Sequence, residues 1–479
     1  MIIMSKIKNY KYIIPLGICL AVAGCTPALA PLVETKAVPE SFNKSTDTTN
    51  IAATPWQTYF KDPNLINLIE IALKNNQELQ ITLQEIEIAK NDIRVRKGAL
   101  LPKVGIGAGA GIEKVGRYTS QGAGDASTEI RPGLEMPEPL GDLKIAAYAN
   151  WEVDIWKKLR NSKKAAISRY LATVEGKNFV ITNLIAEVAD SYYELLALDS
   201  QLDIVKQNIA LQSTALEIVK FQKEAARSTE LAVQKFQAEV MASKSMEFEI
   251  LQNINETENK ISFLLGQYPQ EIKRDKSNFI SLLPPVIHSG IPAQLLANRP
   301  DIKQAEMELE AAKLDVKVAR AEFYPSLDIT AKVGVNAFKS SYLFTLPESL
   351  LYSFVGDFAA PLINRNAIKA EYKSANARQI QALYNYERAI LNAYLDVSSQ
   401  LSKINNLEKS YQLKAQQVDA LSRSIAVAGD LFKSARVDYF EVLMTQRDAL
   451  ESKLELIETK KEQLNAVVHV YRDLGGGWK

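Results

Sequence analysis

The chain contains one structural unit twice, and this duplication limits its possible folds more than any other feature. Residues 75–106 align without a gap with residues 298–329, at an offset of 223 that pairs Pro102 with Pro325. Farther along the offset falls to 209, so 14 residues are extra in the first copy. Whatever architecture one half adopts, the other half is expected to repeat.

Apolar residues recur every seven positions at equivalent places in both copies. They are Val174, Ile181, Val188, Leu195, Leu202, Ile209 and Leu216, then Leu383, Ile390, Val397, Ile404, Tyr411, Val418 and Ile425. Such a seam predicts long helices supercoiled left-handedly against neighbours, although the period would also fit an ordinary bundle core. Helices that begin near residues 157 and 365 could run for roughly 100 Å, at about 1.5 Å per residue. That length favours an extended coiled structure.

Each copy also contains two segments with the alternation of a β-strand. The four segments are 100–112 and 145–155 in the first copy, and 323–335 and 351–360 in the second. The loops between them, 116–142 and 337–349, are rich in Gly, Pro, Ser and polar residues. Each copy is therefore predicted to contain a helix, a β-hairpin, a very long helix, a turn and a helix.

The predicted strands match the length of membrane-spanning β-strands, about 9 to 11 residues. One face is apolar, and the other carries charges suited to a water-filled lumen: Lys103, Glu152, Asp154, Asp328 and Lys332. A half-buried sheet packed on soluble helices would alternate in the same way. Four strands cannot close a barrel, because single-chain barrels begin at eight strands and an open edge cannot lie in lipid. Strands that cross a membrane here must therefore be pooled from several chains.

The first 24 residues have the pattern of a bacterial lipoprotein signal. Lys6, Lys8 and Lys11 flank an apolar stretch at 12–23 that is too short for a stable transmembrane helix. The sequence VAGC then predicts cleavage before Cys25 and a diacylglycerol on its sulfur. A plain signal peptide with an incidental cysteine is the alternative. No later apolar run reaches 18 residues, so a spanning helix is not expected.

Composition argues against nucleic acid as a partner and against an enzyme. The 57 basic and 56 acidic side chains nearly balance, so the chain lacks the positive surplus of nucleic-acid-binding proteins. The two histidines, His288 and His469, are far apart and outside any cluster with metal-ligand spacing. The run Gly105-x-Gly107-x-x-Ala110 continues as a strand pattern, whereas a dinucleotide fingerprint must open a helix. No cofactor, metal or catalytic residue is expected.

A tight turn between two helices is predicted in each copy, at residues 226–237 and 435–446, which share the offset of 209. Ser228, Thr229 and Asp438 are residue types that start helices, because their side-chain oxygens accept hydrogen bonds from free backbone N–H groups. An antiparallel helical hairpin is therefore expected at each site.

Several longer motifs carry a resemblance to one family. The segments 55–76, 151–160 (WEVDIWKKLR), 296–327 and 470–479 (VYRDLGGGWK) resemble TolC-like outer membrane factors of the efflux lipoprotein branch. The run RPDI…AE…FYPS, within 296–327, is the most specific of these motifs. The resemblance implies a mainly α-helical fold with a small membrane β-barrel portion. In that fold a trimer forms one outer-membrane barrel of twelve strands, continued by an α-helical tunnel through the periplasm.

The resemblance also implies partners and site residues. An inner-membrane transporter of the RND type would deliver cargo by way of a periplasmic adaptor, which docks in this family at the two helix turns. The turns carry over onto Ala226, Arg227, Ser228, Thr229 and Glu230, and onto Ala435, Arg436, Val437, Asp438 and Tyr439. Family turns often contain glycine, where this chain has alanine nearby. Asp430 is the candidate for an acidic ring that closes the tunnel; a solvated surface aspartate is the alternative.

The expected organisation places a signal at 1–24, a lipidated segment at 25–74, the first repeat at 75–265, a linker at 266–297 and the second repeat at 298–479. The expected function is an outer membrane channel that exports small molecules, with drugs as the favoured cargo. The alternative is an envelope-spanning coiled-coil lipoprotein without a pore. Periplasmic adaptors, which are also exported and coiled-coil, lack duplicated strand pairs of this length. The protein is expected as a homotrimer in contact with outer membrane lipid, with a long periplasmic extension.

Overall fold

The computed structural model describes residues 39, 41–42, 49–276, 279–282, 284, 288–361, 365–434 and 436–478. Two compact units can be distinguished. The strand unit contains Glu87–Tyr170 and Met307–Leu383; the helical unit contains Thr35–Ile86, Leu171–Glu306 and Tyr384–Lys479, as far as each range is described. Within the described ranges, no helix combines the length and apolarity needed to cross a membrane.

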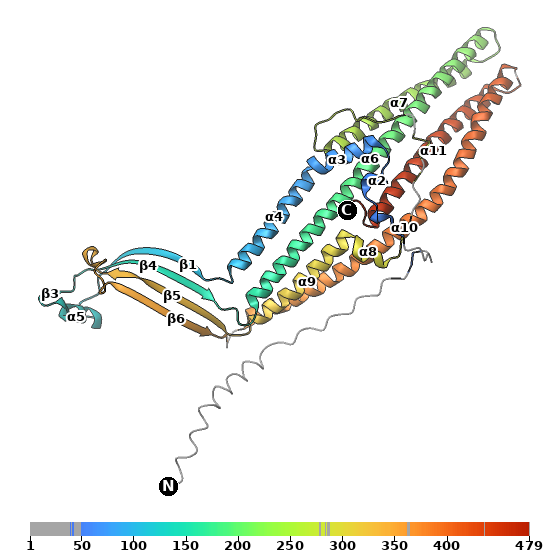
Figure 1. Ribbon diagram of the computed structural model, residues 1–479. Coiled ribbons are helices and arrows are strands. Elements are labelled where there is room, and N and C mark those ends of the chain that lie inside the picture. The colour runs from blue at the N-terminus through green and yellow to red at the C-terminus, as the bar shows by residue number, and fades with distance from the viewer. Residues whose placement is uncertain are drawn as a thin grey trace. The chain divides into compact units, whose positions relative to one another are not determined.

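Four antiparallel strands form the main sheet of the strand unit (Figure 1). They are β1 (Lys103–Glu113), β4 (Leu140–Glu152), β5 (Ser326–Ala337) and β6 (Leu350–Ala359), in the order β1-β4-β5-β6. All four predicted strands are confirmed, and the pairing of β4 with β5 joins the two hairpins into one sheet. The predicted bounds of β4 were wrong. This strand begins inside the predicted loop and ends before Asp154, because that carboxylate accepts the backbone N–H of Leu159 at the start of the next helix.

The loop of the first repeat has a substructure that the sequence did not predict. It contains α5 (Ser120–Ser127) and a small hairpin of β2 (Glu129–Arg131) and β3 (Leu134–Glu135). The Thr119 hydroxyl caps α5 by accepting a hydrogen bond from a backbone N–H in its first turn. The corresponding loop of the second repeat contains one 3-10 turn, η2 (Ser340–Tyr342). The extra residues of the first repeat therefore enlarge the end of the sheet that lies away from the helices (Figure 1).

The sheet has one apolar and one polar face, as the alternation predicts. One row across the four strands is Ile106, Ala147, Val333 and Tyr352, and the next row, on the opposite face, is Gly105, Tyr148, Lys332 and Ser353. On the apolar face Ile106 and Tyr352 are each 80% exposed and Phe354 is 75% exposed. So broad an apolar surface is costly in water, whereas lipid would cover it at no such cost.

Glycines in β1 make room for side chains of β4 on the polar face. A Cβ at Gly105 would lie 2.7 Å from the ring of Tyr148, and a Cβ at Gly109 would lie 2.9 Å from the Lys144 side chain. These side chains therefore lie across the backbone of β1. The close approach explains why glycine occupies these positions on the polar face of the strand.

Two very long helices follow the hairpins, as predicted. The 67 residues of α6 (Lys158–Glu224) and the 68 residues of α10 (Asn366–Lys433) begin within one residue of the expected starts. Each is followed by a helix of 35 residues, α7 (Glu230–Leu264) or α11 (Tyr439–Asp473). Every heptad position of both copies is buried or half-buried. The predicted seam is therefore the packed side of these helices.

The remaining helices precede the hairpins or lie between the repeats. Their bounds are η1 (Ile51–Ala53), α2 (Trp56–Tyr59), α3 (Pro63–Asn75), α4 (Gln77–Gly98), α8 (Ala293–Asn298) and α9 (Pro300–Ala321). The largest core of the helical unit includes Tyr192, which is fully buried, and Tyr59, which stacks on Tyr471 with ring centroids 4.1 Å apart. Burial raises the pKa of Tyr471 to about 12, so this ring stays neutral at any physiological pH.

The two repeats also match at the ends of α7 and α11, in details that no periodicity predicts. Gly266 and Gly475 both end a helix with positive φ, +66° and +88°, and an added Cβ would lie 2.5 Å from the carbonyl oxygen of Asn75 or Asn298 respectively. Two further side chains occupy equivalent positions: the Asn76 amide donates to the Leu264 carbonyl, and the Arg299 guanidinium donates to the Asp473 carbonyl. Each helix end is thus held by the chain that leads into α4 or α9.

Candidate functional site

The first helix turn, between α6 and α7, follows the predicted residues closely. The Thr229 hydroxyl caps α7 by accepting the backbone N–H of Ala232 at 3.2 Å. At the end of α6 the backbone N–H of Arg227 donates to the Gln222 carbonyl at 2.7 Å, and Ala226 between them has a φ of 56°. This is the left-handed helix end that glycine normally supplies. The first of the two alanines that stand where family turns often contain glycine, Ala226, therefore has a left-handed backbone, a conformation that strains an alanine.

The second turn, between α10 and α11, repeats this arrangement at the offset of 209. The Asp438 carboxylate caps α11 by accepting the backbone N–H of Tyr439 at 2.6 Å, and the backbone N–H of Arg436 donates to the Leu431 carbonyl at 2.9 Å. Ala435, which the sequence also placed at this turn, lies outside the described residues. Both turns expose an arginine at equivalent positions, Arg227 and Arg436.

One ion pair closes the first turn. The Lys223 ammonium, near the end of α6, contacts the Glu230 carboxylate at the start of α7. Hydrogen bonds from Lys223 and from Gln234 lower the pKa of this carboxyl group. Glu230 also lies in the first turn of α7, where a negative charge is favoured by the helix dipole. The contact spans the turn, but both charged groups stay in solvent, so the pair contributes little to stability.

Substitution of Ala226, which has a left-handed backbone conformation, measures the strain in the first turn. Ala226→Gly should stabilise the turn by about 1 kcal/mol, because a left-handed conformation costs an L-residue about that much and costs glycine little. Amide hydrogen exchange at Arg227 should then slow roughly fivefold, as about 1 kcal/mol implies. Ala225→Gly is the matched control, since Ala225 has no positive φ and should become less stable. Equal exchange in both variants would contradict the strain.

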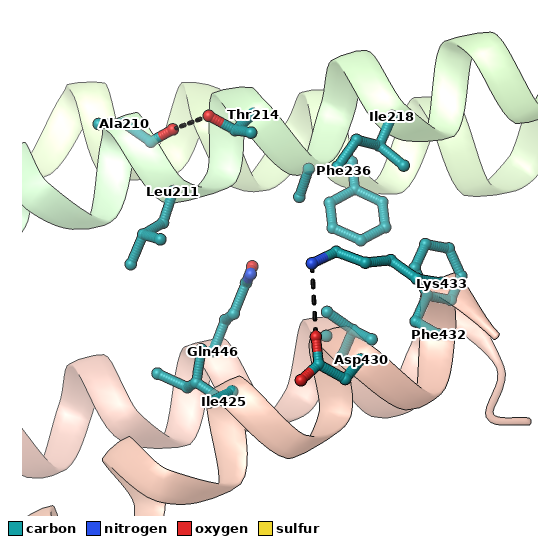
Figure 2. Close-up of a pocket in the computed structure, with 14 residues that line it drawn as sticks. Ala210, Leu211, Thr214, Ile218, Phe236, Ile425, Asp430, Phe432, Lys433 and Gln446 are labelled. Atoms are coloured by element: carbon teal, nitrogen blue, oxygen red, sulfur yellow. Dashed lines mark hydrogen bonds and ion pairs between the residues drawn. The ribbon is translucent and has the colours of Figure 1, made fainter.

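A cavity of about 510 Å³ lies between the two helical hairpins of the helical unit, near their turns. Figure 2 shows apolar side chains from both hairpins facing each other across it, with Ile218 and Phe236 on one side and Ile425 and Phe432 on the other. The sequence did not predict this cavity, because its lining residues are up to 236 positions apart, from Ala210 to Gln446, and only tertiary packing brings them together.

Asp430, the predicted gate residue, lies at this cavity and is exposed. Its carboxylate is 3.4 Å from the Lys433 ammonium, and the two side chains are 80% and 67% exposed (Figure 2). An exposed pair one turn apart contributes little to stability, typically under about 0.5 kcal/mol. The carboxylate therefore remains accessible to solvent at the edge of the cavity.

Two other residues that were singled out from the sequence are Cys25 and His469. Cys25 lies outside the described residues. His469 contacts the Asp190 carboxylate at 2.7 Å between α6 and α11. Within the described residues, no group of three or more His, Cys, Asp or Glu side chains is placed to hold a metal ion.

Comparison with known proteins shows which family the chain resembles along its length. The model of a family described as outer membrane efflux protein matches residues 68–267 and 291–476. The pyoverdine export outer membrane protein OpmQ of Pseudomonas aeruginosa is 27% identical over 479 residues, which cover 99% of this chain and 98% of OpmQ. The cation efflux system protein CusC of Escherichia coli O6:H1 is 27% identical over 476 residues, which cover 98% of this chain and 99% of CusC.

A solved structure shows the same fold. The open state of the MtrE outer membrane channel of Neisseria gonorrhoeae superposes with a TM-score of 0.82 at 22% identity, covering 95% of this chain and 99% of MtrE. The family match spans both repeats and most of the chain, from the helix before the first hairpin to the C-terminal tail. The chain therefore belongs to the outer membrane efflux protein family, and it is an outer membrane channel of a tripartite efflux system.

Proposed function

We propose that three copies of this chain close their twelve strands into one barrel and carry small molecules through it, from an inner-membrane pump of the RND type and a periplasmic adaptor. The two-faced sheet is the observation that carries the proposal. Its apolar face is open, its polar face bears charges of both signs, and β1 and β6 are edge strands. An open edge in lipid leaves backbone groups unpaired, at several kcal/mol each, so neighbouring copies are needed to complete the sheet.

The native mass of the detergent-extracted protein tests this proposal. A mass of three chains, with a shift in gel mobility between unheated and heated samples, is the expected result for a pooled barrel. A monomer, or a rod absent from the outer membrane fraction, would leave the four strands without closure and reject the channel. The intact mass of the denatured chain reports a second point: acylation predicts an N-terminus at Cys25 with added diacylglycerol and an amide-linked acyl chain.

The cargo is proposed as a class, small soluble molecules with drugs favoured, and the pump is proposed to select among them. The polar rows of the sheet pair Lys332 with Tyr148 and Ser353, and the Thr330 hydroxyl with the Asn150 amide at 3.2 Å. These groups would line a hydrated passage without forming a shaped, desolvated pocket, which selective binding requires. Relatives named for pyoverdine export and for cation efflux are consistent with a duct that leaves selection to its partner.

The two turns are proposed as the adaptor-docking sites. Charge reversal of the equivalent arginines, Arg227→Glu together with Arg436→Glu, should reduce adaptor binding at least tenfold, because like-charge contacts at an interface cost several kcal/mol. Both residues are exposed. Lys220→Glu, seven residues before Arg227 and therefore about two helical turns farther from the site in α6, is the control and should bind normally. The measurement is co-purification with the cognate adaptor; unchanged binding of the double variant would move the docking site elsewhere.

Asp430 is proposed as part of a ring of three carboxylates that narrows the passage near the second turn. Asp430→Ala should raise single-channel conductance in planar bilayers, because three charges and three ion pairs with Lys433 are lost together. Asp419→Ala removes a comparable exposed pair from the same helix, 2.8 Å from Arg423, and should leave conductance unchanged. Equal conductance of Asp430→Ala and the unsubstituted channel would exclude this residue from the gate.

A further inference from the structure

A second cavity, of about 690 Å³, lies in the strand unit where the strands of the first repeat meet the helices. Leu100, Trp151 and Ile167 form its apolar walls, and Lys163 and Lys164 of α6 reach it from the helix. Trp151 belongs to the apolar face of the sheet, because it pairs with Ile329 of β5. The cavity therefore opens on the face assigned to lipid, at the level where the strands end.

The acidic group at this cavity is already engaged. The Asp154 carboxylate accepts the backbone N–H groups of Leu159 and Arg160, at 2.9 and 3.0 Å, and pairs with the Arg160 guanidinium at 3.1 Å. It is 6% exposed. Lys163 and Lys164 make no ion pair with any residue in the described ranges. The cavity thus presents two ammonium groups that no carboxylate in the described ranges pairs with, so they are available to an anionic ligand.

The second repeat shows that the cavity is not imposed by the architecture. Its residues equivalent to Leu100 and Lys163, at offsets 223 and 209, are Phe323 and Tyr372. Their rings fill the corresponding space: the centroids are 5.9 Å apart, and the side chains are 3% and 6% exposed. Arg365 lies over the Phe323 ring at 5.2 Å. The same backbone therefore packs tightly with aromatic side chains, and the first repeat instead keeps an opening with a lysine.

The number of basic residues also differs between the two repeats in the segments where the strands meet the helices. Residues 91–103 and 152–164 of the first repeat contain nine Lys or Arg against three Asp or Glu. The equivalent residues 314–326 and 361–373 contain five against three. The surplus lies at the end of the strands, where the membrane boundary falls if the sheet crosses it. Basic groups at such a boundary attract anionic headgroups, and tryptophan is enriched there.

We infer that this cavity binds the phosphate headgroup of an anionic phospholipid in the periplasm-facing leaflet, with Lys163 and Lys164 as its ligands. The apolar walls would take the first part of an acyl chain, and the Trp151 indole is held in place by its hydrogen bond to the Leu100 carbonyl at 3.1 Å. The occupant is a lipid and not a free anion, because half of the lining residues are apolar and Trp151 among them lies on the apolar face of the sheet. The inference rests on the proposed barrel, and it adds one lipid site to each chain.

Native mass spectrometry of the intact trimer tests the inference, with phosphatidylglycerol and phosphatidylcholine as the added lipids. The unsubstituted trimer should retain up to three phosphatidylglycerol molecules in preference to phosphatidylcholine. Lys163→Ala together with Lys164→Ala should weaken phosphatidylglycerol binding about twenty-five-fold, the effect of two surface cations at roughly a factor of five each. Lys369→Ala together with Lys373→Ala, exposed positions of the second repeat on α10, is the matched control and should bind as the unsubstituted trimer does.

Each outcome decides a different point. A trimer without preference for phosphatidylglycerol, or equal losses in both double variants, overturns the site while leaving the channel intact. Displacement of phosphatidylglycerol by millimolar glycerol 1-phosphate would identify a site for free anions and also overturn it. Loss of the trimer in the unsubstituted protein would instead reject the proposed barrel. Lys163→Tyr, which copies the second repeat, should abolish binding while preserving trimer stability, and retained binding in that variant contradicts the inference.

Discussion

Ala331→Lys should strongly destabilise the assembled channel, whereas Thr330→Lys should be tolerated. The two residues are consecutive in the middle of β5, but Ala331 lies on the apolar face, between Ala149 and Phe354, and Thr330 lies on the polar face. A lysine on the lipid face near the middle of a membrane strand costs about 2–4 kcal/mol. Each trimer would carry the substitution three times.

Loss of heat-resistant trimer on gels, together with the amount of protein in the outer membrane fraction, measures this effect. The comparison is well matched, because both variants add the same side chain at nearly the same depth. Equal behaviour of the two would mean that the faces are not divided between lipid and lumen. A greater loss in Thr330→Lys would reverse the assigned faces.

Arg274→Ala should be the most damaging single substitution in the helical unit. Its guanidinium, 3% exposed, makes ion pairs with Asp199 of α6 and at 2.5 Å with Glu258 of α7, and it donates to the Ile272 carbonyl at 2.8 Å. The Asp199 side chain is also 3% exposed. Removing one partner of a buried ion pair leaves the other charge unpaired and costs about 3–5 kcal/mol. The chain leaving α7 would then lose its attachment to the long helices.

Thermal melting of the detergent-solubilised channel measures the loss, and a neighbouring lysine provides the control. Lys276 also approaches Asp199, at 3.6 Å, but its side chain is 57% exposed. Lys276→Ala should therefore cost less than about 1 kcal/mol, as exposed pairs do. Similar melting temperatures for the two variants would show that burial does not govern this network.

Local features of the fold could be predicted from the sequence because each depends only on residues close together in the chain. The heptad spacing from Val174 onward defined α6, and the alternation after Pro102 and Pro325 defined β1 and β5. Thr229 and Asp438 start their helices as their side-chain chemistry predicts. Period and capping act within one or two turns, so no knowledge of distant residues is needed.

Features that depend on what lies opposite were decided by tertiary structure alone. The pairing of β4 with β5 joins residues that are 176 to 194 positions apart, from Glu152 with Asp328 to Leu143 with Ala337, and no local signal specifies it. Gly475 is required because the Asn298 carbonyl approaches it, and Tyr148 lies over Gly105 because β4 pairs with β1 in one particular register. Likewise, the duplication predicted two equivalent junctions, yet only packing showed one filled and one open. The sequence by itself determined the helices, the strands and their repetition. The cavities and close contacts were decided by tertiary structure, because they depend on side chains that are distant in the sequence and that no single segment encodes.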